Sequence, residues 1–163
     1  MSIETDLALI ATQEAHLRFA AFDEDTAWTL GALLKTKAKA LEAAVVIEVR
    51  LARETVFFFA MPGTAPANAD WARRKRNTVE LLNCSSYATG LALKAEQATL
   101  EDKMGLPTRD YACHGGSFPI VVTGVGCIGV VTVSGLPQRQ DHALVVQALA
   151  ELCGVAVHDL ALA

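Results

Sequence analysis

The chain has 163 residues, of which 52% are hydrophobic and 20% charged, and its formal net charge at pH 7 is −4. This length fits a single domain, residues 1–163, that can bury a proper hydrophobic core. The acidic balance argues against a nucleic-acid partner, because no excess of lysine and arginine is present to displace counterions from phosphates.

Compartment and further partners follow from the same composition. No apolar run approaches the about 20 residues that span a bilayer, so no membrane partner is expected. The first residues are acidic and lack a signal-peptide pattern, which makes the cytoplasm the expected compartment. The four cysteines form no C-x-x-C pair and are expected to be reduced thiols. The high apolar content predicts a homo-oligomer, since surplus apolar surface usually lies in a subunit interface.

Two helices and two strands are predicted in the first part of the chain. Residues 3–17 have near-helical apolar spacing, and Asp23 is a suitable N-cap for a second helix whose apolar stripe ends at Leu41. Residues 44–50 and 55–61 are expected to be strands. Their nearly continuous apolar residues predict a sheet covered on both faces.

The second part of the chain returns to helices before a hairpin. The order of elements is not an alternating βαβ pattern, so it predicts an α+β fold with an antiparallel sheet between helices. The predicted elements are helices 68–83, 86–97 and 100–104, an irregular loop 108–117, strands 119–123 and 127–134, a last helix capped by Asp141, and a candidate edge strand at 17–22.

Lys75 is the unusual residue of the predicted helix 68–83. At 100° per residue it falls in the middle of the apolar stripe that contains Trp71, Ala72 and Val79. An ammonium group on an inward face must extend past the core edge, pair with a carboxylate or meet an anionic ligand. Arg74 is the neighbouring cation that would complete an anion site, because its planar guanidinium matches carboxylates and phosphates.

The loop around His114 is the second candidate region. His114 is followed by Gly115 and Gly116 and preceded by Tyr111. The histidine has three possible roles: iron or metal ligand, general base, or loop residue bonded to a carbonyl group. No second ligand stands at metal-site spacing, so no metal centre is expected. The glycines either allow a positive φ or bring backbone amides close to a ligand, and Phe118 is expected in the core.

Asp141 and His142 open the last predicted helix. One interpretation is an N-cap aspartate followed by an exposed histidine. The alternative places the helix N-terminal amides and His142 at the rim of a pocket that would accept an anion. Ser134 has no nucleophile-elbow context, so nothing fixes the geometry of a hydrolase triad.

Three motifs together resemble the haem-degrading-domain (GlcG-like) superfamily. They are similar to its uncharacterised bacterial and yeast branch, which pairs W-x-x-R-K with H-G-G-x-F-P-I. The similarity covers roughly residues 20–155. The motifs are Trp71-x-x-Arg74-Lys75-Arg76-Asn77, His114-Gly115-Gly116-Ser117-Phe118-Pro119-Ile120, and residues 129–137 followed by Asp141-His142.

The resemblance implies a profilin-like three-layer α/β/α sandwich around a central five-stranded antiparallel sheet. It also implies homo-oligomers, and haem becomes a candidate cofactor because some relatives in the superfamily bind it. No catalytic residue is implied. The expected ligand-binding residues, facing a shared pocket near a subunit boundary, are Trp71, Arg74, Lys75, Tyr111, His114, Gly115, Gly116, Phe118, Asp141 and His142.

Three functions remain open at this point. The first is a cytoplasmic, homo-oligomeric binder of an anionic small molecule; the second is a non-catalytic scaffold for protein partners. The third is an enzyme with a histidine acid or base, which needs one cleft for both His114 and His142. Lys75 discriminates between the first two, because pairing with a carboxylate of the same chain favours the scaffold and an open cavity favours the ligand.

Overall fold

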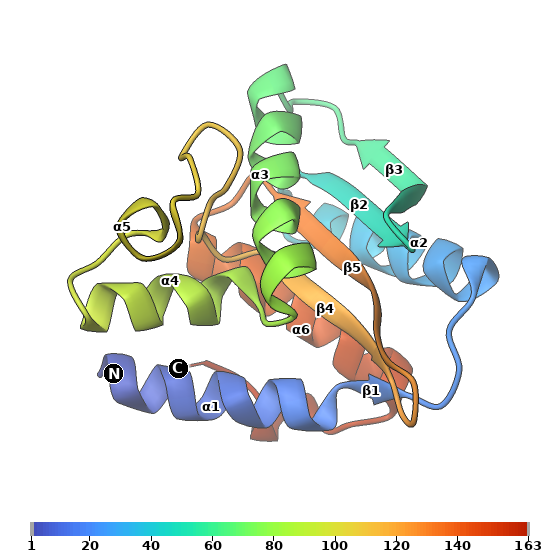
Figure 1. Cartoon of the computed structure of the whole chain (residues 1–163). Coiled ribbons are helices and arrows are strands. Elements are labelled where there is room, and N and C mark those ends of the chain that lie inside the picture. Colours follow the sequence, from blue (N-terminus) through green and yellow to red (C-terminus); the bar gives the residue numbers. More distant parts are fainter. Residues whose placement is uncertain (1, 163) are drawn as a thin grey trace.

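The computed structural model describes residues 2–162, apart from the side chain of Asp159, and shows an α+β fold (Figure 1). The helices are α1 (Ile3–His16), α2 (Glu24–Ala40), α3 (Pro66–Leu82), α4 (Ser86–Ala95), α5 (Leu100–Met104) and α6 (Gln138–Cys153), followed by the 3₁₀ turn η1 (Val157–Asp159). The strands are β1 (Arg18–Phe19), β2 (Val46–Leu51), β3 (Glu54–Ala60), β4 (Ser117–Val122) and β5 (Gly126–Ser134).

The five strands form one sheet in the order β1-β4-β5-β2-β3. The pairs β4–β5, β5–β2 and β2–β3 are antiparallel, whereas β1 pairs with β4 in parallel. The prediction of a fully antiparallel sheet is therefore wrong at this edge, although the fifth strand itself is present. Strand β1 is two residues long and enters directly from α1, so the path of that helix sets its direction.

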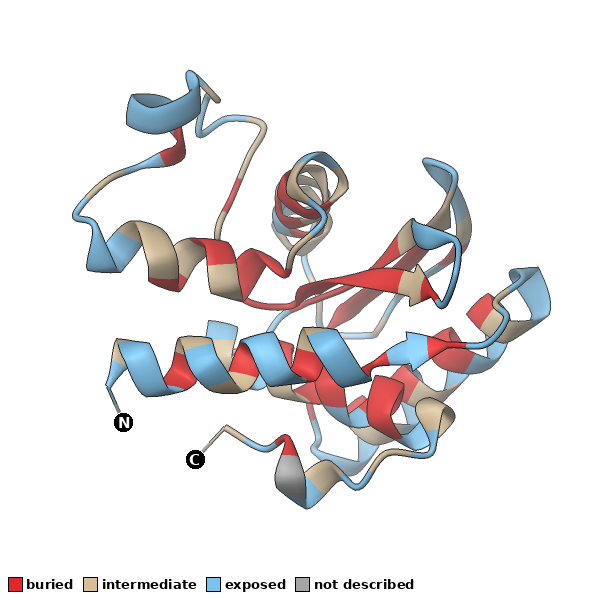
Figure 2. Cartoon of the chain, turned by 60° about the horizontal axis from the view of Figure 1, so that its bottom comes forward, coloured by how far each residue is buried: buried red, intermediate tan, exposed pale blue. Residues whose placement is uncertain are grey.

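Helices cover the sheet in two layers (Figure 1). Helices α2 and α6 pack on one face, where residues such as Leu34, Ile47 and Leu149 form the main core cluster. Helix α3 crosses the other face, and α4 lies beside α1 around Ile10, Tyr87 and Leu91. Figure 2 shows the buried residues on the sheet and on the helix faces turned towards it. The main hydrophobic core is thus formed between the sheet and α2 with α6, and a smaller cluster lies between α1 and α4.

The sheet is covered less completely than its apolar strands predict. Phe58 on the edge strand β3 is 51% exposed, although its neighbour Phe57 is buried against α2. Successive side chains of a strand point to opposite faces, and α3 lies over β2, β4 and β5. The face of β3 that carries Phe58 is therefore open.

Two helix starts differ from the predicted positions. Helix α3 begins at Pro66, because proline fits the first helical turn, where its missing N–H is not needed. Helix α6 begins at Gln138 after Pro137, so Asp141 lies inside the helix and is not its N-cap. The N-cap of α2 is as predicted, with Asp23 accepting a hydrogen bond from the Thr26 amide at 2.8 Å.

Two whole-chain features accompany this fold. All four cysteines are free thiols. Within the described residues, no helix is long and apolar enough to cross a membrane.

Candidate functional site

Three segments that are far apart in the sequence meet at one end of the sheet. They are α3 with Lys75, the loop that leads through Gly115 into β4, and the first turn of α6 with Asp141. The W-x-x-R-K and H-G-G motifs thus lie next to each other, as the expectation of a shared site requires.

Lys75 is at the centre of this junction and is only 2% exposed. Its Nζ donates hydrogen bonds to the carbonyl oxygens of Gly115 (3.0 Å) and Val133 (2.7 Å) and to Oδ2 of Asp141 (3.0 Å). An ammonium group has three donors, so all of them are occupied by the protein itself. Of the three options for this inward lysine, the structure shows pairing with a carboxylate.

Asp141 connects the lysine to the start of α6. Its carboxylate also accepts hydrogen bonds from the amides of Gly135 (3.3 Å) and Leu136 (3.0 Å), which precede the helix. Burial lowers the pKa of Lys75 and raises the pKa of Asp141, and in each residue the charge of the partner opposes that shift. The five hydrogen bonds of the pair favour its ionised form.

The paired glycines allow this close packing. A Cβ atom on Gly115 would clash with the carbonyl oxygen of Gln138 in α6. Gly116 has a φ of +119°, and a Cβ there would lie 2.7 Å from Nζ of Lys75. The predicted positive φ is confirmed at Gly116, and the close approach is to other parts of the chain.

His142 and Phe118 lie in the interior and line neither hollow described below. Phe118 is 1% exposed, which confirms the core position, and its ring centroid is 5.9 Å from that of His142. His142 is fully buried, with Nε2 2.8 Å from Oε1 of Gln13 in α1. Both predicted positions of His142, an exposed site and a pocket rim, are therefore wrong. Burial lowers the pKa of His142 to about 3, so it is neutral at pH 7.

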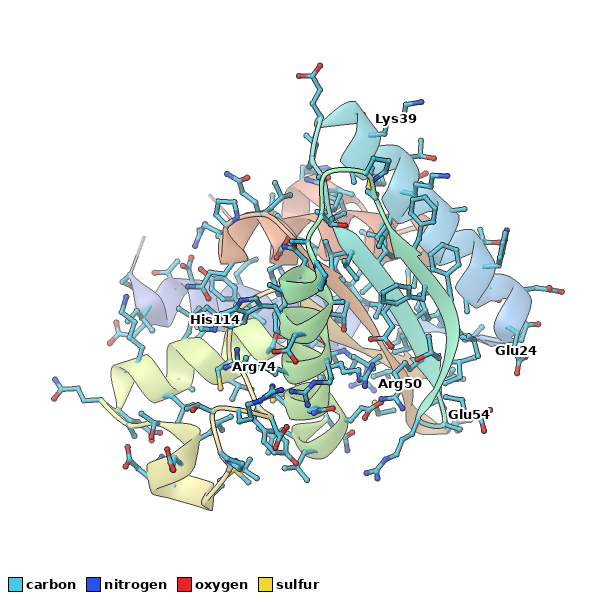
Figure 3. All side chains as sticks on the ribbon, turned by 90° about the horizontal axis from the view of Figure 1, so that it is seen from above. Glu24, Lys39, Arg50, Glu54, Arg74 and His114 are labelled. Atoms are coloured by element: carbon cyan, nitrogen blue, oxygen red, sulfur yellow. The ribbon has the colours of Figure 1, made fainter. Side chains whose placement is uncertain are left out.

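Trp71, Arg74 and His114 form the accessible part of the site. The Arg74 guanidinium lies 4.3 Å from the Trp71 ring centroid, and the His114 ring contacts the same indole edge-to-face at 4.8 Å. Figure 3 shows Arg74 and His114 on the α4 side of α3, with Arg50 on the opposite side. Arg74 is held by two hydrogen bonds to the carbonyl oxygen of Thr108, from Nε at 2.9 Å and Nη2 at 2.5 Å.

His114 lies on the border of two hollows. The polar hollow has a volume of about 260 Å³ and the apolar hollow about 430 Å³. The polar hollow is lined by Asn68, Trp71, Lys75, His114, Gly115, Ser134, Gly135, Leu136, Gln138 and Asp141. The apolar hollow is lined by Arg74, Tyr87, Gly90, Leu91, Leu93, Lys94, Ala98, Thr99, Leu100, Leu106, Thr108, Tyr111, Ala112, Cys113, His114 and Gln138.

The surroundings of His114 favour the neutral form of its imidazole. Partial burial, followed by the charges of Lys75 and Arg74, lowers the pKa of its imidazole. The residue as a whole is still exposed, and its ring nitrogens have no hydrogen-bond partner in the described part of the chain. A neutral imidazole offers one lone pair and one N–H, which can ligate iron or contact a polar ligand. Between residues 2 and 162, no group of three or more His, Cys, Asp or Glu side chains is placed to hold a metal ion.

Sequence reasoning missed the residues that α4 and α5 contribute. Leu91, Lys94 and Leu100 line the apolar hollow, but no motif marks them. Gln138 borders both hollows, because α6 starts four residues earlier than expected, with its N-cap at Pro137 and not at Asp141. The helical periodicity of residues 86–97 predicts the helix but not the loop that folds back over it.

Comparisons with known proteins show the family of this chain. A family model described as haem degrading protein HbpS-like matches residues 22–150. The chain is 57% identical over 159 residues to UPF0303 protein R02983 of Rhizobium meliloti (strain 1021), covering 98% of this chain and 96% of the relative. The chain therefore belongs to the HbpS-like haem-degrading protein family, among its UPF0303 members.

Solved structures share the fold. The Ybr137w protein superposes with a TM-score of 0.83 at 27% identity, over 91% of this chain and 87% of the other. A structure of a PduOC:heme complex superposes with a TM-score of 0.69 at 20% identity, over 80% of this chain and 94% of the other. At that identity the second likeness concerns the fold alone.

Proposed function

We propose that this protein is a cytoplasmic homo-oligomer that binds an anionic small molecule at His114, near a subunit interface, with haem as the first candidate. The observation that carries the proposal is the exposed His114 imidazole, which has no hydrogen-bond partner among the described residues and borders two hollows. Its lowered pKa keeps a lone pair available at pH 7.

Arg74 supplies the positive charge for the anionic group. Its planar guanidinium pairs with carboxylates in a bidentate manner, and the Thr108 carbonyl holds it beside His114. Lys75 cannot take this role directly, since its three donors are occupied. It acts instead by holding Gly115 and the start of α6 in place.

Two further observations support the proposal. The family is named for haem degradation, and the PduOC domain of the same fold forms a complex with heme. Exposed Trp28, Phe58 and Leu81 provide apolar surface suited to contact with a second copy of the chain.

A haem titration followed at the Soret band tests the proposal. We expect a saturable shift at one haem per chain that is lost in His114→Ala. His16→Ala is the matched control, because His16 is an exposed histidine whose Nδ1 lies 2.8 Å from the Thr12 carbonyl oxygen. An unchanged Soret band in His114→Ala would exclude His114 as the iron ligand. The absence of a shift in the wild type would exclude haem as the ligand.

The scaffold is the second candidate, and the Lys75–Asp141 pair favours it. This pair uses motif residues to fix three segments together, without a ligand. Native mass spectrometry discriminates between the two functions, since a scaffold would keep its oligomer and retain no small molecule. The enzyme hypothesis gains no support, because the buried His142 shares neither hollow with His114.

A further inference from the structure

Besides the motif residues Arg74 and His114, the apolar hollow is lined by residues of α4, α5 and the loop before β4. Helix α4 forms one wall through Leu91 and Leu93, and α5 closes the hollow with Leu100, its buried residue. Leu106 and the ring of Tyr111 come from the loop that returns towards β4. Figure 1 shows α5 and this loop standing away from the sheet, beside α4. The volume of about 430 Å³ is within the range of small-ligand sites.

The lining of the apolar hollow is apolar even at its thiol, Cys113. Burial raises the pKa of Cys113 to about 11, so its side chain is an uncharged small hydrophobe at pH 7. Tyr87 also lines the hollow, and its hydroxyl accepts a hydrogen bond from Arg139 at 3.4 Å, so this polar group already has a partner in the protein. A hydrophobic body of one or two rings therefore finds favourable contacts here.

The charges at the hollow have one sign. Arg74 and Lys94 line it, and among the described lining residues none carries a carboxylate. Lys94 is exposed and forms no ion pair within the described chain, and Nη1 of Arg74 donates no hydrogen bond there. These cations offer unused donors to an anion.

We propose that the apolar hollow binds an amphipathic monocarboxylate, with its apolar body between α4 and α5 and its carboxylate on Arg74. Lys94 adds positive potential at the rim. This proposal deepens the proposed function by naming a ligand class, and it rests on that function through the two residues that both use, Arg74 and His114. It does not require iron.

Two fluorescent probes with the same rings test the ligand class. The first is 8-anilinonaphthalene-1-sulfonate, an amphipathic anion, and the second is N-phenyl-1-naphthylamine, which lacks the acidic group. We expect saturable binding of the anion at one per chain. Ala98→Trp, which fills the hollow, should weaken both probes by about tenfold or more, since burial of the rings supplies most of the affinity. Ala11→Trp on the exposed face of α1 is the matched control.

The charge is tested separately. Arg74→Gln should weaken the sulfonate probe by about tenfold and leave the neutral probe within about twofold, because one charge-assisted pair is lost. Lys94→Gln should have a smaller effect in the same direction, and Lys39→Gln, an exposed lysine on α2, should have none. If Arg74→Gln weakens both probes equally, the anionic part of the proposal is overturned.

The remaining outcomes separate this proposal from the haem site. Unchanged binding in Ala98→Trp would overturn the hollow as the site; if that variant does not fold, Leu106→Trp repeats the test from the opposite wall. The Soret shift reports iron ligation at His114, whereas the probe titration reports occupation of the apolar hollow, and both are measured on the wild-type chain. Failure of the haem titration alone therefore refutes the proposed function, and failure of the probe titration alone refutes this inference.

Discussion

The two hollows beside His114 are built in different ways. The polar hollow lies over a buried ion pair that joins α3, the β4 loop and α6. Its glycines are packed so closely that an added Cβ atom would clash. The apolar hollow is closed by the five residues of α5 and a loop, with Leu100 as the buried contact of that helix. The motifs that are conspicuous in the sequence thus belong mainly to a fixed junction, and most residues that line the larger hollow, apart from Arg74 and His114, lie outside the motifs.

The largest expected effect is the loss of the ion pair. Lys75→Met leaves the Asp141 carboxylate buried without a cation, which costs about 3–5 kcal/mol in the free energy of unfolding. Urea denaturation measures this loss, and Lys39→Met on the surface should cost less than about 0.5 kcal/mol. The double variant Lys75→Met with Asp141→Leu should recover much of the stability. A cost below about 1 kcal/mol for Lys75→Met would show that the pair does not fix the junction.

The next largest loss of stability should come from a glycine substitution in the same junction. Gly116→Ala combines a φ of +119° with a Cβ that meets the Val133 carbonyl and Lys75, so we expect a loss of about 2–3 kcal/mol. Gly124→Ala is the matched control, because Gly124 also has a positive φ, +79°, but nothing lies within 4 Å of the added Cβ. Only the conformational cost of about 1 kcal/mol should remain there. Equal losses would mean that the close packing at Gly116 contributes nothing.

The junction also shows how far the sequence alone leads. The 3.6-residue period places Lys75 on the inward face of its helix, and the structure confirms this. Its partner Asp141 is 66 residues away, and a helical pattern holds no information about a contact between elements. The buried position of His142 cannot be predicted for the same reason, since its partner is Gln13, 129 residues distant. Local patterns predict faces and elements, whereas tertiary contacts decide which polar groups can be buried.

The sheet edges show a related limit. The direction of β1 depends on where α1 delivers the chain, and two residues carry no alternation pattern from which pairing could be inferred. At the other edge, the three phenylalanines of β3 indicate burial on both faces, yet Phe58 is half exposed because α3 does not reach over β3. An apolar residue at an edge can therefore serve an interface instead of the core.

A pH dependence should come from His142, beneath the junction. Its pKa in the fold is about 3, below the ordinary value of 6.5, so the unfolded chain binds the proton more readily. The stabilising effect of the neutral ring is complete above about pH 6.5 and is lost as the pH falls towards 3. We expect a decrease of roughly 1–2 kcal/mol between pH 7 and pH 5, measured by denaturation at each pH.

The control for this titration is His142→Asn, which cannot be protonated. Its stability is lower at pH 7, but the slope between pH 7 and pH 5 should largely disappear. Asp6 does not account for the slope, because its hydrogen bond with Arg139 lowers its pKa below 3.8 and shifts its titration to more acid solutions. A slope that persists in His142→Asn would assign the titration to another group, with His114 as the first alternative.

The smallest effect should come from the apolar hollow. Leu34→Ala in the main core should cost about 3 kcal/mol, because the cavity left there is closed on all sides. Leu100→Ala should cost only about 1 kcal/mol, since the side chain already borders open space and its removal enlarges that space. Circular dichroism during urea denaturation measures both losses. A cost for Leu100→Ala equal to that for Leu34→Ala would make α5 part of the core, and the hollow would then lack the separate wall that distinguishes it from the junction beside it.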